Sequence, residues 1–115
     1  MIKASEGGYN KMNIKELNEK VRNNQKKELE KKIEEIERYI LWRGDNGFND
    51  FEVSTNRSSI ISIREWMIES LKEYFENNGY KVEVKEIGGL ISRIEKLFGI
   101  YEPEYLMIIS WEEIN

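Results

Sequence analysis

The chain contains neither cysteine nor histidine among its 115 residues. Without cysteine no disulfide can form, which is typical of proteins from reducing compartments. The two absences together exclude thiolate nucleophiles, imidazole bases and the usual zinc ligands. We therefore expect no cofactor and no metal centre, and the sequence predicts a protein that is not an enzyme.

Long hydrophobic runs are missing as well. Nowhere do about 18 apolar residues follow one another, which is the length that predicts a membrane-spanning helix. The opening segment, MIKASEGGYNK, holds no apolar run of the kind found in secretory signals. The sequence thus predicts a protein of the cytoplasm or of a virion, neither secreted nor held in a membrane.

Charge is distributed unevenly along the chain. Residues 1–43 carry 11 Lys and Arg against 8 Asp and Glu, a net charge of +3, whereas residues 44–115 carry 7 against 14, a net charge of −7. An acidic second part repels the phosphate backbone of nucleic acids. We therefore expect the partner to be another protein or a second copy of the chain, and neither a nucleic acid nor a small-molecule substrate.

Composition indicates one folded domain. Hydrophobic residues make up 39% of the chain and aromatic residues 11%, enough for a single modest core at this length. Residues 1–12, broken by two glycines, are expected to form a flexible leader. Residues 13–115 are expected to form a single α+β domain.

A long helix is predicted at the start of this domain. Asn13 suits the N-cap, Glu16 suits the third helical position, and Met12 and Leu17 are spaced as a hydrophobic staple. One apolar stripe then continues to a C-terminal signal at Arg43-Gly44; it consists of Ile14, Leu17, Val21, Leu29, Ile33, Ile36 and Ile40. Such a helix of about 30 residues is too long for so small a core to cover. Either it breaks near Asn23-Asn24 or its front half packs on a partner.

The remaining pattern completes an α-β-α-β-α-β order with a three-stranded mixed sheet. A β-α-β crossover predicts parallel first and second strands, with the third between them and antiparallel to both. The nearly continuous apolar run of the last strand predicts that it is covered on both faces.

The second helix is expected to start in a capping box at Ser62 to Glu65, to bury Trp66 and to end at Gly79. The expected elements are strand 48–55, helix 62–79, strand 80–85, a short helix within 88–99 and strand 105–111.

Three charged residues offer a catalytic alternative. Glu83 and Lys85 alternate on a strand, and Asp50 precedes another strand, as in the Asp…Glu-x-Lys pattern of metal-dependent nucleases. Carboxylates on one face bind magnesium, and a lysine steadies a phosphate. Charges on the solvent-facing side of a strand produce the same short pattern.

Five apolar or aromatic residues are the candidates for partner binding. Ile14, Leu17 and Val21 form an apolar edge that a polar gap through Gln25 separates from the rest of the stripe. Near the end of the same helix, Tyr39 and Trp42 are of the types that dominate interface hot spots. Trp42 is open to two interpretations, a core residue or an interface anchor.

The order of elements resembles a class of small bacteriophage-encoded α/β proteins. The resemblance rests on four features in this order. The first two are the charged N-terminal helix and the short strand after Asn46-Gly47. The others are the helix that ends in Asn-Gly-Tyr-Lys-Val-Glu-Val at residues 78–84 and the last strand, which closes on Ile-Ser-Trp at residues 109–111. It covers residues 13–87 and 104–112 and departs at residues 87–102, where that class has only a hairpin turn. It supplies no catalytic residues.

The resemblance implies a virion-associated or host-modulating protein. Together with the residues above, it predicts a non-catalytic protein–protein interaction module that is a minor structural or accessory protein of a bacteriophage particle, with the N-terminal helix as its docking element. The alternatives are a phage-encoded inhibitor of a host enzyme and a small metal-dependent nuclease using Asp50, Glu83 and Lys85.

Overall fold

The computed structural model describes residues 13–87, 97–99 and 103–112. Its contacts divide the chain into two units, residues 1–31 and residues 32–115, and the first helix runs through the boundary between them. The predicted leader and most of the predicted helix within residues 88–99 lie outside the described residues. The elements are α1 (Ile14–Asp45), β1 (Asp50–Ser54), the 3₁₀ helix η2 (Glu65–Met67), α2 (Ile68–Asn77), β2 (Lys81–Ile87) and β3 (Glu104–Ser110).

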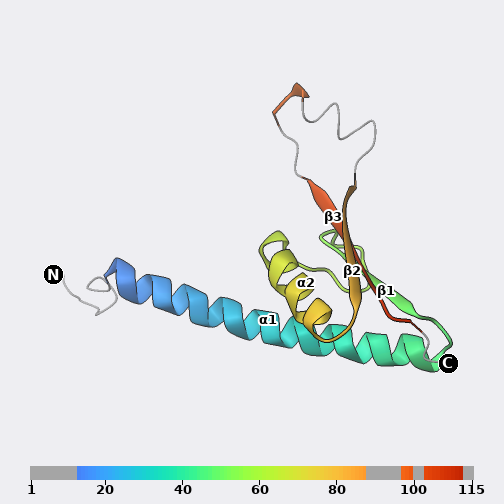
Figure 1. Ribbon diagram of the computed structural model, residues 1–115. Coiled ribbons are helices and arrows are strands. Elements are labelled where there is room, and N and C mark those ends of the chain that lie inside the picture. The colour runs from blue at the N-terminus through green and yellow to red at the C-terminus, as the bar shows by residue number, and fades with distance from the viewer. Residues whose placement is uncertain (1–12, 88–96, 100–102, 113–115) are drawn as a thin grey trace. The chain divides into compact units, whose positions relative to one another are not determined.

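Helix α1 is one unbroken element of 32 residues (Figure 1). The predicted N-cap is confirmed, because the backbone amide of Glu16 donates to Oδ1 of Asn13 at 2.9 Å. The predicted alternative of a break near Asn23-Asn24 is wrong. Asparagine is a poor helix former, but the cost per residue is below about 1 kcal/mol and does not interrupt a long helix.

The C-terminus of α1 lies beyond the predicted Arg43-Gly44 signal. Gly44 remains helical, and the left-handed residue that follows the helix is Gly47, with φ of 85°. The amide of Phe48 donates to the carbonyl oxygen of Arg43 at 3.0 Å, which closes the last turn. The Asn46-Gly47 pair therefore ends the helix and turns the chain toward β1.

The three strands form a sheet of order β1-β3-β2. The position of β3 between the other two agrees with the prediction. Both neighbouring pairs are antiparallel, with Phe51 opposite Ile109 in one and Val82 opposite Ile109 in the other. As predicted, β1 and β2 run in the same direction and β3 is antiparallel to both. Because β1 and β2 are not adjacent, they form no parallel pair, so the sheet is antiparallel and its description as mixed is wrong.

One face of the sheet carries the core of residues 32–112. Alternate strand positions point to this face, and α2 packs beside the sheet (Figure 1). The C-terminal part of α1 reaches the same face, because the ring of Tyr39 stacks on Phe51 with centroids 5.5 Å apart. The buried apolar residues are Ile36, Ile40, Phe51, Val53, Ile61, Ile63, Met67, Leu71, Phe75, Val82, Met107 and Ile109.

The opposite face of β3 is only half-buried. The register places Ile108 between Glu52 and Glu83, and Leu106 lies between Ser54 and Lys85. Both apolar side chains are of intermediate exposure, so the prediction that β3 is covered on both faces is wrong. The flanking carboxylates and the ammonium group need water, and for that reason this face stays open beside them.

The second helix begins later than the sequence predicted. Ser62 forms a parallel bridge with Ser54, and the amide of Ile63 donates to the carbonyl oxygen of Ser54 at 2.9 Å. Because this segment is extended, the predicted capping box at Ser62 does not form, and Trp66, expected in the core, is 39% exposed. The predicted end at Gly79 is confirmed by its φ of 91°.

Candidate functional site

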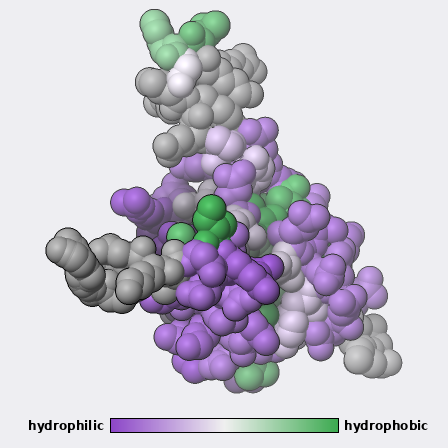
Figure 2. All heavy atoms as spheres, turned by 90° about the vertical axis from the view of Figure 1, so that its left-hand side faces the viewer, coloured by the Kyte–Doolittle hydropathy of each residue, from purple (hydrophilic) through white to green (hydrophobic). Residues whose placement is uncertain are grey.

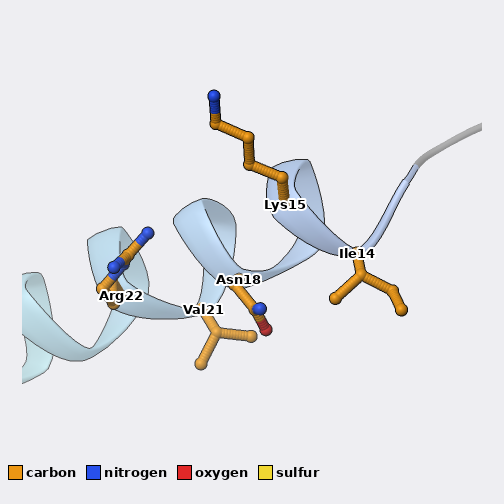
Figure 3. Close-up of a pocket in the computed structure, with 5 residues that line it drawn as sticks. All are labelled: Ile14, Lys15, Asn18, Val21 and Arg22. Carbon is orange, nitrogen blue, oxygen red and sulfur yellow. The ribbon is translucent and has the colours of Figure 1, made fainter.

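The first candidate surface is the apolar edge of α1, formed by Ile14, Leu17 and Val21. Their side chains are 77%, 51% and 45% exposed. Figure 3 shows Ile14 and Val21 pointing to the same side of the helix, with Asn18 between them and Lys15 pointing away. Single exposed apolar residues are ordinary, but three on one edge of one helix form a surface that another molecule can bury.

Basic residues flank this edge on both sides. At about 100° per residue, Lys20 and Lys27 lie about 90° to 115° from the centre of the edge on one side, and Arg22 lies about 105° from it on the other. Lys15 and Glu16 lie further round the helix, each about 130° from the edge, and Glu19 lies directly opposite it. Figure 2 shows that hydrophilic side chains dominate the face seen there and that hydrophobic ones form only small separate patches.

The apolar edge and the basic residues beside it favour one kind of partner surface. An amphipathic helix binds by laying its apolar residues into an apolar groove, with anchors at spacings of three and four residues. Lysine and arginine on both flanks favour a groove with carboxylates on its rims and disfavour one with basic rims. The apolar edge of α1 is therefore suited to an acidic partner surface.

The two aromatic candidates differ from each other. Tyr39 is 37% exposed, and its ring stacks on Phe51, so Tyr39 contributes to the fold of residues 32–112. Trp42 is 56% exposed, which rules out the core interpretation. Its role as an interface anchor stays a prediction. The carbonyl oxygen of Trp42 accepts hydrogen bonds from the backbone and side-chain nitrogens of Asn46 at 3.1 and 2.7 Å.

The structure does not bring Asp50 close to Glu83 and Lys85, the residues of the nuclease alternative. Asp50 is paired with Arg43, whose Nη2 lies 2.9 Å from Asp50 Oδ1. The register places Asp50 opposite Ser110 of β3, and Lys81 lies opposite Ser110 on its other side, whereas Glu83 lies two residues further along β2. Two strand spacings across the sheet and two residues along the strand place the Cα atoms of Asp50 and Glu83 about 12 Å apart, and the Asp50 carboxylate is already paired with Arg43. Among the described residues, no three His, Cys, Asp or Glu side chains lie close enough to hold a metal ion.

Two open grooves lie on residues 32–112. One, of about 770 Å³, has apolar walls from Trp66, Ile68, Val84 and Tyr105, with Glu65 and Glu69 beside them. The other, of about 910 Å³, lies around Tyr80 and Trp111, whose rings meet edge to face with centroids 6.0 Å apart. Sequence reasoning missed the first groove, because it placed Trp66 in the core.

One ionisable group is shifted by its surroundings. The Tyr74 hydroxyl donates to Oε2 of Glu37 at 3.1 Å. This hydrogen bond raises the pKa of Tyr74, and desolvation and the negative charge of Glu37 raise it further. The pair links α2 to α1 at a partly buried position, and we assign it to the fold rather than to chemistry.

Comparison of the chain with protein-family models, with curated proteins and with solved structures gives no match. Within the ranges that the structure describes, no helix combines the length and the apolar character needed to cross a membrane.

Proposed function

We propose that the chain is a non-catalytic protein–protein interaction module whose docking element is the front of α1. The observation that carries the proposal is the apolar edge of α1: three large aliphatic side chains exposed between two basic flanks. Burial of such side chains contributes about 1.5–3 kcal/mol each, enough for three of them to supply the core of an interface.

The proposed occupant is an apolar groove with carboxylate rims on another protein. Two copies of α1 packed edge to edge would bring Lys20 and Lys27 of each copy close to the basic flanks of the other, which is unfavourable. A groove with acidic rims pairs with both flanks at once. Because exposed ion pairs are screened by salt, binding of this kind weakens as ionic strength rises.

Photo-crosslinking from two positions of the full-length protein tests the proposal. A benzoyl-phenylalanine at residue 17 should yield one discrete crosslinked protein, and the same group at residue 23, on the opposite side of α1, should not. The captured protein is then purified and titrated with Leu17→Glu and with the matched control Asn23→Glu. We expect Leu17→Glu to weaken binding by at least about 100-fold, in line with loss of a central anchor, and Asn23→Glu to change it less than about threefold.

Equal crosslinking from the two positions would overturn the proposal, as would equal affinities of the two variants. A crosslink from residue 17 to a second copy of the chain would show that the edge serves self-association instead.

The narrower prediction, a minor structural or accessory protein of a bacteriophage particle, rests on the resemblance alone and stays a prediction. The same holds for inhibition of a host enzyme. Both are compatible with a docking helix, and the identity of the crosslinked protein separates them, since a capsid or tail protein supports the first and an enzyme supports the second.

A further inference from the structure

The open edge of the sheet carries a pattern that is complementary to itself. In the part of the chain that the structure describes, β2 pairs with β3 on one side and with no strand on the other. The opposite edge is partly covered, because the segment at Ser62 bridges Ser54 of β1. Five of the seven residues of β2 are exposed, and an edge of this kind is a template for pairing with another strand.

The charges of β2 define one register for such pairing. Lys81, Glu83 and Lys85 share the open face, and Val82 and Val84 share the core face. If two β2 strands pair antiparallel with Val84 opposite Val84, each Glu83 lies opposite Lys85 of the second copy. Opposite charges at directly facing positions stabilise a strand pair, and like charges destabilise it.

Neighbouring registers of the two β2 strands bring like charges to facing positions or misalign the two sheets. A shift by two residues in one direction places Lys81 opposite Lys85 and Glu83 opposite Glu83. A shift by two in the other direction places Lys85 opposite Lys85. A shift by one residue would put the core face of one sheet on the open face of the other. The Val84-centred register is therefore the one that uses all seven residues of β2 with no like charges facing each other.

We propose that the chain forms a homodimer by antiparallel pairing of β2 with β2 of a second copy, centred on Val84. The two sheets become one six-stranded antiparallel sheet with a two-fold axis at Val84, an isologous interface. The pair Glu83 and Lys85, whose charged groups lie 3.9 Å apart on one chain, takes cross-strand partners in the dimer. The proposal is independent of the apolar edge of α1.

Lysine on an edge strand often serves to prevent pairing, and the alternating sign distinguishes β2 from such an edge. With Lys81 and Lys85 alone, no register that keeps the faces aligned would bring opposite charges to facing positions. Glu83 between them supplies an attractive facing partner for Lys85 in the Val84-centred register. Because seven residues a side bury less than a standard interface, we expect a weak dimer.

Charge reversal of the full-length protein tests the proposal, measured by sedimentation from about 10 μM to about 1 mM at low salt. In Glu83→Lys, two lysines of each copy face each other, and in Lys85→Glu, two glutamates do. Each variant alone should dimerise at least about tenfold more weakly than the wild-type protein. The Glu83–Lys85 pair occurs twice in the symmetric dimer, so each substitution makes two facing pairs repulsive. The double variant Glu83→Lys/Lys85→Glu exchanges the signs and should dimerise as the wild-type protein does.

Mixing the two single variants is the most direct test of the facing charge pairs. One chain then carries two lysines and the other two glutamates, so both facing pairs are attractive and a heterodimer should form although neither variant dimerises alone. Circular dichroism of each variant confirms that these exposed substitutions leave the fold intact.

A wild-type protein that is monomeric throughout the concentration range would overturn the proposal. Self-association that charge reversal leaves unchanged, or a mixture that behaves as its two components do, would overturn it as well. Association through α1 would respond to Leu17→Glu and not to these changes, so the two surfaces are tested separately.

Discussion

Arg43 and Asp50 are joined twice across the turn between α1 and β1. Nη2 of Arg43 contacts Oδ1 of Asp50 at 2.9 Å, and Nε of Arg43 donates to the carbonyl oxygen of Asp50 at 2.9 Å. The guanidinium group also lies 3.9 Å from the centroid of the Phe48 ring. Asp50, which the sequence offered as a metal ligand, thus fixes the last turn of α1 to the start of β1.

This pair predicts a small, salt-dependent loss of stability in Asp50→Ala. The side chains are partly exposed, so the loss in the free energy of unfolding should be no more than about 1 kcal/mol at low salt and smaller at high salt. Urea unfolding at two salt concentrations measures it. Glu52→Ala, on the same face of β1, is the matched control and should show no such salt dependence. A salt-independent effect of Asp50→Ala would argue against the ion pair.

Leu71 tests the packing of α2 on the sheet. The side chain is fully buried, so Leu71→Ala should lower the free energy of unfolding by about 2–5 kcal/mol through lost contacts and a cavity. Leu41→Ala, at a position 69% exposed, should cost less than about 0.5 kcal/mol. Denaturant midpoints compare the two. Equal midpoints would show that α2 does not carry its apolar stripe into the core.

Two glycines should respond in opposite directions to the same substitution. Gly79→Ala places a Cβ at φ of 91° and should cost about 1 kcal/mol through backbone strain alone, because nothing lies within 4 Å. Gly44→Ala lies within α1, where the new Cβ would meet only Cζ2 of Trp111 at 4.0 Å, and should stabilise by about 0.5–1 kcal/mol. Thermal unfolding gives both signs. A stabilised Gly79→Ala protein would contradict the assigned turn.

The hydrogen bond between Tyr74 and Glu37 predicts a change at high pH. Because the pKa of Tyr74 is raised in the fold, the protonated hydroxyl contributes stability that is fully present below pH 10.0 and is lost as the pH rises through the folded value. The difference in ultraviolet absorbance between the wild-type protein and Tyr74→Phe should titrate above pH 10.0. Glu37→Ala should move this midpoint downward, and an unmoved midpoint would assign the shift to another cause.

The sequence predicted the elements whose signals are local. Asn13 caps α1, Gly79 ends α2, and the alternation of β2 matches its register, since each of these features depends on a few neighbouring residues. The position of β3 between the other strands followed from chain connectivity.

The errors arose where tertiary contacts compete with local preference. Ser62 and Ile63 read as a helix start but extend along β1, where burial of Ile63 outweighs a capping box. That displacement also leaves Trp66 exposed and opens the groove beside it. The apolar edge of α1 was predicted residue by residue, whereas the self-complementary edge of β2 required a register, which periodicity alone does not supply.

Thermal unfolding of a chain that lacks residues 1–24 tests the central claim most directly. If the apolar edge of α1 serves docking and not folding, the truncated protein should melt cooperatively within a few degrees of the full-length protein while losing the partner that residue 17 contacts. Loss of the cooperative transition would show instead that Ile14, Leu17 and Val21 belong to the core, and the docking element would not exist.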